Sequence, residues 1–295
     1  LASQAASLGP GKAKESADLY ETAVLEEQQA IKLDPKQFGS HVALGQIYAN
    51  TGKHEASISE LQIACQLKPA SYGAHRDLGI ACLTAGKVDE AIDALKKASS
   101  LKPERPEAHM KLAILLAKRG SEKEALVEAN EAVKLSPKDP ETHIALANIM
   151  LDSGDAAGSI PEFKIALSIA KNHPNALSGM GYAIAKRNAP GDIDSAIDHQ
   201  RRAIASAKFF LPSYVRLAEL LASQGKNKEA EEQYKAALRI NPDDAGVGTE
   251  YAKFLEKNGR KEEAQAVLKR VLDKTPHFKA ASDALAGMKS PGRTK

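Results

Sequence analysis

The chain has 295 residues, and its 41 lysine and arginine residues nearly balance its 38 aspartate and glutamate residues, giving a net charge of +3. Such a balance excludes the strongly basic surface that is typical of proteins that bind nucleic acid. Tryptophan is absent, aromatic residues make up 4% of the chain, and alanine, leucine, lysine and glutamate dominate. This composition predicts an all-α protein.

No apolar run approaches the ~20 residues that cross a bilayer, so the sequence predicts a soluble segment without direct membrane insertion. The first residue is Leu1 and not methionine, which leaves room for an upstream leader, anchor or domain. The compartment therefore stays open: cytoplasmic, or periplasmic or otherwise extracytoplasmic if a leader was removed before Leu1. The two cysteines, Cys65 and Cys82, form neither a disulfide framework nor a metal-type pair, and we expect both to be small buried apolar residues.

Residues 1–37 are predicted to hold a tail and a half or truncated repeat, with a helix over about residues 14–33. After this segment a unit of about thirty-four residues recurs, closed in most copies by a proline that stops the helix. The closing prolines are Pro35, Pro69, Pro103, Pro137, Pro242 and Pro276. Seven repeats are predicted over residues 38–278: 38–71, 72–105, 106–139, 140–173, 174–210, 211–244 and 245–278.

Each repeat predicts two helices joined by a tight turn. Positions seven, eight and eleven, such as Leu112, Ala113 and Leu116, form one apolar stripe on the first helix. A glycine such as Gly120 follows, and it accepts the left-handed conformation that ends a helix. The second helix buries small and apolar residues before the closing proline.

Two places depart from this pattern. Repeat 140–173 ends in Ala170-Lys171-Asn172-His173 without its closing proline. Repeat 174–210 contains three extra residues, Ala189-Pro190-Gly191, before it ends in Lys208-Phe209-Phe210. Either a loop insertion or a feature that contacts a partner accounts for the irregular stretch 170–210. At the C-terminus, residues 279–295 are predicted to form a capping helix followed by a disordered tail.

With these columns the chain resembles the tetratricopeptide repeat family. The stretch Leu78-Gly79, Gly86, Glu90-Ala91, Leu95, Ala98 and Pro103 matches the family pattern nearly throughout. The resemblance implies a right-handed superhelical solenoid of helix-turn-helix repeats. It also implies a non-catalytic scaffold for protein–protein interaction.

Four histidines, His41, His75, His109 and His143, share the fourth position of successive repeats. Helices pack about 8–10 Å apart, whereas two imidazoles that share one metal ion must each place a nitrogen about 2 Å from it. This column therefore predicts packing between helices and no metal site. The sequence also lacks the motifs of common hydrolases, P-loops and dinucleotide sites, so we predict no catalytic residues, no cofactor and no enzyme activity.

The resemblance implies a concave groove lined by positions two, five, six, nine, twelve and thirteen of the first helices. In repeats two to five these positions hold many apolar residues with lysine and arginine among them, which suits an amphipathic helix or an extended peptide. The alternative is that several of them touch the adjacent repeat. The candidate groove residues are Arg76, Ile80, Leu83, Met110, Lys111, Ile114, Lys118, Ile144, Asn148, Leu151, Tyr182 and Lys186.

The family's clamp for chaperone C-terminal carboxylates is absent from these columns, and so is the asparagine ladder of its glycosyltransferase-linked arrays. We therefore expect a scaffold that binds a peptide or amphipathic helix of a protein partner, with Arg76, Lys111 and Lys118 orienting an acidic segment. Two alternatives remain: a platform that self-assembles into homo-oligomers, and an accessory region of a larger enzyme or secretion complex.

Overall fold

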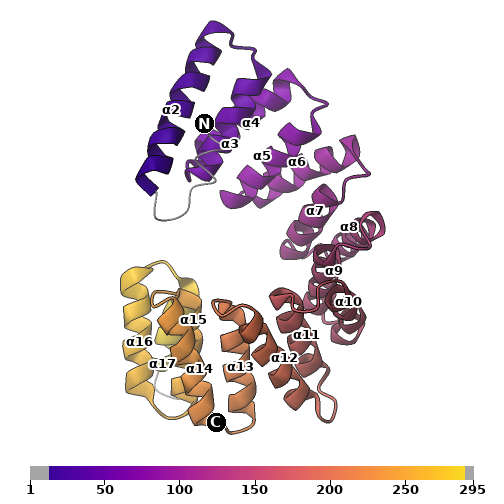
Figure 1. Ribbon diagram of the computed structural model, residues 1–295. Coiled ribbons are helices and arrows are strands. Elements are labelled where there is room, and N and C mark those ends of the chain that lie inside the picture. The colour runs from indigo at the N-terminus through magenta and orange to yellow at the C-terminus, as the bar shows by residue number, and fades with distance from the viewer. Residues whose placement is uncertain (1–12, 290–295) are drawn as a thin grey trace. The chain divides into compact units, whose positions relative to one another are not determined.

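The computed structural model describes residues 13–289, with side chains described over residues 17–288 (Figure 1). Within that range the backbone forms sixteen α-helices and no β-strand, which confirms the all-α prediction. The helices are α2 (Ala13–Leu33), α3 (Phe38–Asn50), α4 (His54–Leu67), α5 (Tyr72–Thr84), α6 (Val88–Leu101), α7 (Pro106–Lys118), α8 (Glu122–Leu135), α9 (Pro140–Asp152), α10 (Ala156–Ile169), α11 (Pro174–Arg187), α12 (Asp192–Ser206), α13 (Leu211–Ser223), α14 (Asn227–Ile240), α15 (Ala245–Lys257), α16 (Lys261–Lys274) and α17 (Lys279–Lys289). The predicted tail after Lys289 lies outside the described residues.

Local chemistry explains where the helices begin and end. The side chains of Ser71, Asp139 and Asp244 accept hydrogen bonds from free N–H groups in the first turns of α5, α9 and α15. The six glycines of the predicted turns all have positive φ between 74° and 89°: Gly52, Gly86, Gly120, Gly154, Gly225 and Gly259. A residue with a Cβ would be strained in that conformation.

The chain divides into two units, Leu1–Ser153 and Gly154–Lys295. In the first unit α3, α5 and α7 each pack along the helix that follows them, and α9 packs on α7 and α8. Apolar side chains from successive helices form a continuous core, because each helix pair leaves one face for its neighbour. Its largest fully buried members include Leu61, Leu95, Leu112, Leu115 and Leu116.

In the second unit α10 packs on α11, and the pairs α11–α12, α13–α14 and α15–α16 follow (Figure 1). Tyr234, Tyr251 and Phe254 form an aromatic cluster in its core, with ring centroids 5.4–6.4 Å apart. Helix α17 packs on α15 and α16 and buries Ala281, Leu285 and Met288. These three side chains cover the apolar face that the last helix pair would otherwise expose.

Small residues at position eight make room for a leucine of the second helix. A Cβ added to Gly45 would lie 2.5 Å from Leu61 Cγ, and one added to Gly79 would lie 2.6 Å from Leu95 Cγ. Real Cβ atoms do not approach other atoms so closely, and overpacking of this kind is destabilising. In these two repeats the small residue therefore accommodates a leucine side chain, and at Gly79 the backbone oxygen of Ala91 also lies 3.3 Å from the added Cβ.

The three-residue insertion in repeat 174–210 is held by a buried carboxylate. Asp192, at the start of α12, accepts hydrogen bonds from Arg187 Nε at 3.0 Å and Nη2 at 2.6 Å, and from the Ala189 N–H at 2.8 Å. These donors, Arg187 first, lower the pKa of Asp192 below its usual value. Asn188, in the left-handed region with φ 54°, ends α11 within the same turn.

We expect Asp192→Asn to loosen this turn, because an amide offers only one oxygen to donors that now meet two. Hydrogen exchange at the Ala189 amide should become faster, while amides in the middle of α13 keep their protection. Asp194→Asn is the matched control, since Asp194 lies in the same first turn of α12 but is exposed. Equal effects of the two variants would contradict a specific role for Asp192.

Candidate functional site

Several of the residues predicted to line a groove lie on α5, α7 and α9 of the first unit. We call their surface the first-helix face and define it by Ile80, Met110, Lys111, Ile114 and Lys118 together with Asn148. Ile114 is 37% exposed, and Ile80 and Met110 are partly exposed. Position nine of each first helix (Ile80, Ile114, Asn148) thus reaches the surface, as an accessible binding position must.

Ile144 does not belong to this surface. Its side chain is only 4% exposed, so the prediction that it lines an open groove is wrong. Leu83 and Leu151 are intermediate in exposure, as Ile80 and Met110 are, and Leu83 also packs against the core of the first unit. For Ile144 and Leu83 the alternative from the sequence, contact with neighbouring helices, agrees with the structure.

Arg76 takes part in a polar cluster at the edge of a hollow. Its Nε donates to Asp77 Oδ1 at 2.9 Å, and Gln46 Nε2 donates to Asp77 Oδ2 at 2.8 Å. Burial, the largest single influence, disfavours the charged guanidinium, but the hydrogen bond to Asp77 and the charge of Asp77, with smaller contributions from Tyr72 and Glu107, together raise the pKa of Arg76. The hollow has a volume of about 290 Å³ and lies between α3 and α5, with Gln46, Asp77 and Ile80 in its wall.

Lys111 and Lys118 are both accessible to solvent. Lys111 is partly exposed and Lys118 is exposed, and neither forms an ion pair with any residue that the structure describes. Both lie on α7, beside Met110 and Ile114. A partly exposed apolar strip next to two free ammonium groups is therefore present on one helix.

In the second unit Tyr182 and Lys186 line a separate hollow of about 270 Å³, between α11, α12 and α13. The Arg216 guanidinium lies 4.7 Å from the centroid of the Tyr182 ring, and Lys186 Nζ lies 5.3 Å from it. Glu219 is in the same wall, where burial first and the Glu250 carboxylate second raise its pKa. The hollow combines one aromatic ring, two cations and one carboxylate.

Arg216 and Glu219 were missed as site residues. They occupy positions six and nine of repeat 211–244, and the candidate groove had been read only through repeat five. Reading the same columns one repeat further would have found both.

The histidine column has a structural role, as predicted. His41 and His109 each place Nδ1 2.7 Å from a carboxylate, Glu60 and Glu128 respectively. In all four repeats Nε2 lies 3.0–3.1 Å from the carbonyl oxygen six residues earlier, which belongs to Pro35, Pro69, Pro103 or Pro137. A carbonyl only accepts, so each ring donates and ties its first helix to the preceding proline.

The described part of the chain also gives information on metal binding, thiol reactivity and membrane spanning. No group of three or more His, Cys, Asp or Glu side chains there could hold a metal ion. Burial raises the pKa of both Cys65 and Cys82 to about 11, so the thiols stay protonated at neutral pH and are poor nucleophiles. None of the helices between residues 13 and 289 is long and apolar enough to span a membrane.

Family models for the tetratricopeptide repeat match much of the chain. One model matches residues 83–149 and 221–287, and a second matches residues 42–103 and 191–245. A comparison with curated protein sequences gives no match.

Several solved structures have a similar fold. A tetratricopeptide repeat protein from Parabacteroides merdae is 17% identical with a TM-score of 0.72, and the match covers 86% of this chain and 99% of that one. Yeast Tom70 is 14% identical with a TM-score of 0.72, over 95% of this chain and 60% of that one. A chain of the APC/C hetero-tetramer Cut9–Hcn1 is 17% identical with a TM-score of 0.65, over 92% of this chain, which spans 53% of that one. At these identities the likeness is one of fold.

Proposed function

Because the chain belongs to the tetratricopeptide repeat family, we propose that it is a non-catalytic scaffold that binds an acidic, amphipathic segment of a protein partner on the first-helix face. The observation that carries this proposal is the strip on α5 and α7, where Ile114 is 37% exposed and Ile80 and Met110 are partly exposed.

Apolar surface of this kind favours a ligand that buries it. Removing apolar surface from water contributes about 25 cal/mol per Å² to the free energy of binding. A ligand gains this contribution in full only if it does not bury polar groups of its own at the same time. An amphipathic helix or an extended strand with alternating apolar residues satisfies that condition. The half-exposed side chains would then act as the centre of the interface and the lysines as its rim.

The charge of the rim determines which segments are favoured. Lys111 and Lys118 have no ion-pair partner among the described residues, while Arg76 is engaged by Asp77. A segment with aspartate or glutamate beside its apolar residues complements the two lysines and is steered toward them. This differs from the sequence prediction, in which Arg76 shared the task equally.

We expect Ile114→Asp to weaken capture of such a partner at least about tenfold, because it removes the apolar side chain at the centre of the contact. The new carboxylate would also compete with an acidic ligand for Lys111 and Lys118, which lie three residues before it and four after it on α7. Capture from the native source with quantitative mass spectrometry measures the effect, and cross-linking identifies the bound segment. Raising the salt concentration should weaken capture by the parent protein, since exposed charges are screened.

Ile63→Asp is the matched control. Ile63 is 36% exposed, nearly the same as Ile114, but lies on the second helix α4. Partners that are lost from both variants do not report on the first-helix face. Full capture by a folded Ile114→Asp variant, or a bound segment without acidic residues, would contradict the proposal.

A further inference from the structure

The fourth position of each repeat holds an anchoring side chain in five of the seven copies. The four histidines donate to the carbonyl oxygen six residues earlier, and Tyr214 donates through its hydroxyl to Lys208 O at 2.9 Å. In repeat 174–210 the position holds Leu177, which is fully buried. Six repeats thus fill the space between their two helices with a large side chain.

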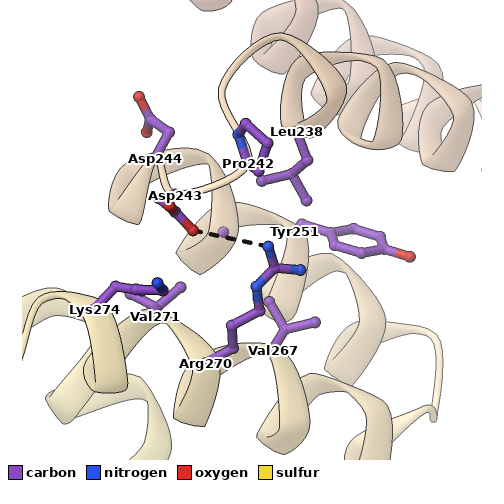
Figure 2. Close-up of a pocket in the computed structure, with 10 residues that line it drawn as sticks. Leu238, Pro242, Asp243, Asp244, Tyr251, Val267, Arg270, Val271 and Lys274 are labelled. Carbon is purple, nitrogen blue, oxygen red and sulfur yellow. Dashed lines mark ion pairs between the residues drawn. The ribbon is translucent and has the colours of Figure 1, made fainter.

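Repeat 245–278 has Gly248 at this position and a pocket in its place. The pocket has a volume of about 160 Å³ and includes Pro242, the residue six positions before Gly248. Figure 2 shows the loop with Pro242 and Asp243 facing the side chains of Val267, Arg270 and Val271. A cavity of about 150 Å³ is large enough to hold a benzene ring.

The residues around Gly248 also differ from those at the same positions of the other repeats. Position twenty-seven is alanine in the other six repeats, for example Ala237, and is Val271 here. A Cβ added to Gly248 would lie 2.6 Å from Val271 Cγ2, so the larger valine takes part of the room that an anchoring residue needs near its own backbone. An aromatic ring of another molecule therefore fits the remaining space more easily than a side chain attached at position 248 would.

The wall of the pocket favours a phenol over an imidazole. In the repeats of His41 and His109, position twenty-three holds Glu60 and Glu128, whose carboxylates contact the Nδ1 atoms of these histidines. In repeat 245–278 the same position holds Val267. An imidazole would find no carboxylate at position twenty-three, just as His75 finds none beside Ala94, whereas a phenol needs only one acceptor. Among the described residues none donates a hydrogen bond to the Pro242 carbonyl. The Asp243 and Asp244 carboxylates also line the pocket, but Asp243 pairs with Arg270 at 3.8 Å and Asp244 accepts from the Val247 N–H at 2.9 Å.

We propose that this pocket binds the side chain of a tyrosine from a partner polypeptide, with the ring between Leu238, Val267 and Val271 and the hydroxyl donating to Pro242 O as Tyr214 donates to Lys208 O. Asp243, Arg270 and Lys274 are exposed around the pocket, so it opens at the surface. Residues 1–12 and 290–295 contain no aromatic residue, so the proposed tyrosine is not among them.

Side-chain analogues test the proposal directly: p-cresol stands for tyrosine, toluene for phenylalanine and 4-methylimidazole for histidine. Calorimetric titration of the full chain should give saturable binding of p-cresol at one site, with toluene about fivefold weaker because it makes no hydrogen bond. N-acetyltyrosine methylamide should bind at the same site. Absence of p-cresol binding overturns the proposal, equal binding of toluene overturns the role of Pro242 O, and exclusion of the tyrosine amide overturns a polypeptide source.

Two variants locate the site. Gly248→Tyr combined with Val271→Ala recreates the pair found at Tyr214 and Ala237, so it should raise Tm and abolish p-cresol binding. Val267→Glu recreates the wall beside His41, so it should weaken p-cresol and strengthen 4-methylimidazole. The second variant changes a partly exposed residue and tests the pocket even if the first fails to fold. Unchanged p-cresol binding in either folded variant places the ligand elsewhere and overturns the proposal.

Discussion

Replacing Phe163 with alanine should lower the free energy of unfolding of the second unit by about 3–5 kcal/mol. The Phe163 ring is fully buried on α10, and it packs against α11 so closely that a Cβ on Gly179 would lie 2.4 Å from its Cε1 and Cζ. Alanine would leave a cavity, because the rigid helix backbones on either side cannot close over it. Urea denaturation measures the loss, and hydrogen exchange should show α10 and α11 opening first.

Phe209→Ala is the matched control for this substitution. Phe209 is the same residue type in the same unit, but its side chain is 80% exposed. Its removal should change the free energy of unfolding by less than about 0.5 kcal/mol. Comparable losses in the two variants would mean that burial against α11 is not the source of the effect.

Glu231→Gln should destabilise the second unit by about 2 kcal/mol at neutral pH. The Glu231 carboxylate, on α14, accepts hydrogen bonds from Arg260 at 2.7 Å, Lys235 at 2.8 Å and Tyr251 at 2.9 Å. Arg260 first, then Lys235, lower the pKa of Glu231 from 4.5 to about 2. The full shift corresponds to about 3 kcal/mol, and solvent around the partly exposed cations reduces that figure.

The same group predicts how stability depends on pH. A carboxylate whose pKa is lower in the folded state stabilises the fold fully above its unfolded pKa, and that contribution is lost as pH falls through the folded pKa. For Glu231 the loss should run from about pH 5 to about pH 2. The difference in stability between the parent chain and Glu231→Gln should therefore shrink over this range, as measured by urea denaturation at several pH values.

Glu263→Gln is the control for the Glu231 prediction. The Glu263 carboxylate accepts a hydrogen bond from the same Arg260 guanidinium at 2.7 Å, but its side chain is 58% exposed. Glu263 lies on α16, only three residues after Arg260. We expect a smaller effect, typical of an exposed pair. A larger loss from Glu263→Gln than from Glu231→Gln would contradict the role given to the link between α14 and α16.

Comparing equivalent positions of the repeats predicted correctly which residues pack in the core, but not which apolar side chains remain exposed to solvent. Leu112 and Leu116 were placed in the core because residues four apart share one face of a helix, and both are fully buried. Ile114 and Ile144 were both assigned to the groove, yet one is 37% exposed and the other 4%. Both are isoleucines on first helices, and the periodicity of one helix does not say how closely its neighbours approach.

Charged residues show the same limit. Arg76 and Lys111 had equal standing as ligand-orienting cations, but Asp77 and Gln46 form a cluster with Arg76 while Lys111 stays free of ion pairs with described residues. Arg216 and Glu219 gained their place beside Tyr182 only when α11 and α13 were seen to share one hollow. The contacts of Gln46 with Asp77 and of Arg216 with Tyr182 join residues more than thirty positions apart. The repeat columns can name Arg216 and Glu219 as candidates, but they do not say which residues each will contact.

The sequence by itself determined the family, the all-α class, the positions of the turns and the structural role of the histidine column. Each of these follows from short-range chemistry: helix periodicity, the left-handed preference of glycine and the helix-stopping effect of proline. Only the tertiary structure decided which apolar side chains stay accessible and which cations are already paired. It also decided that Gly248 leaves a pocket where five other repeats place a ring. Those properties depend on the distances between packed helices, and a change of a few ångströms is enough to bury a side chain or open a cavity.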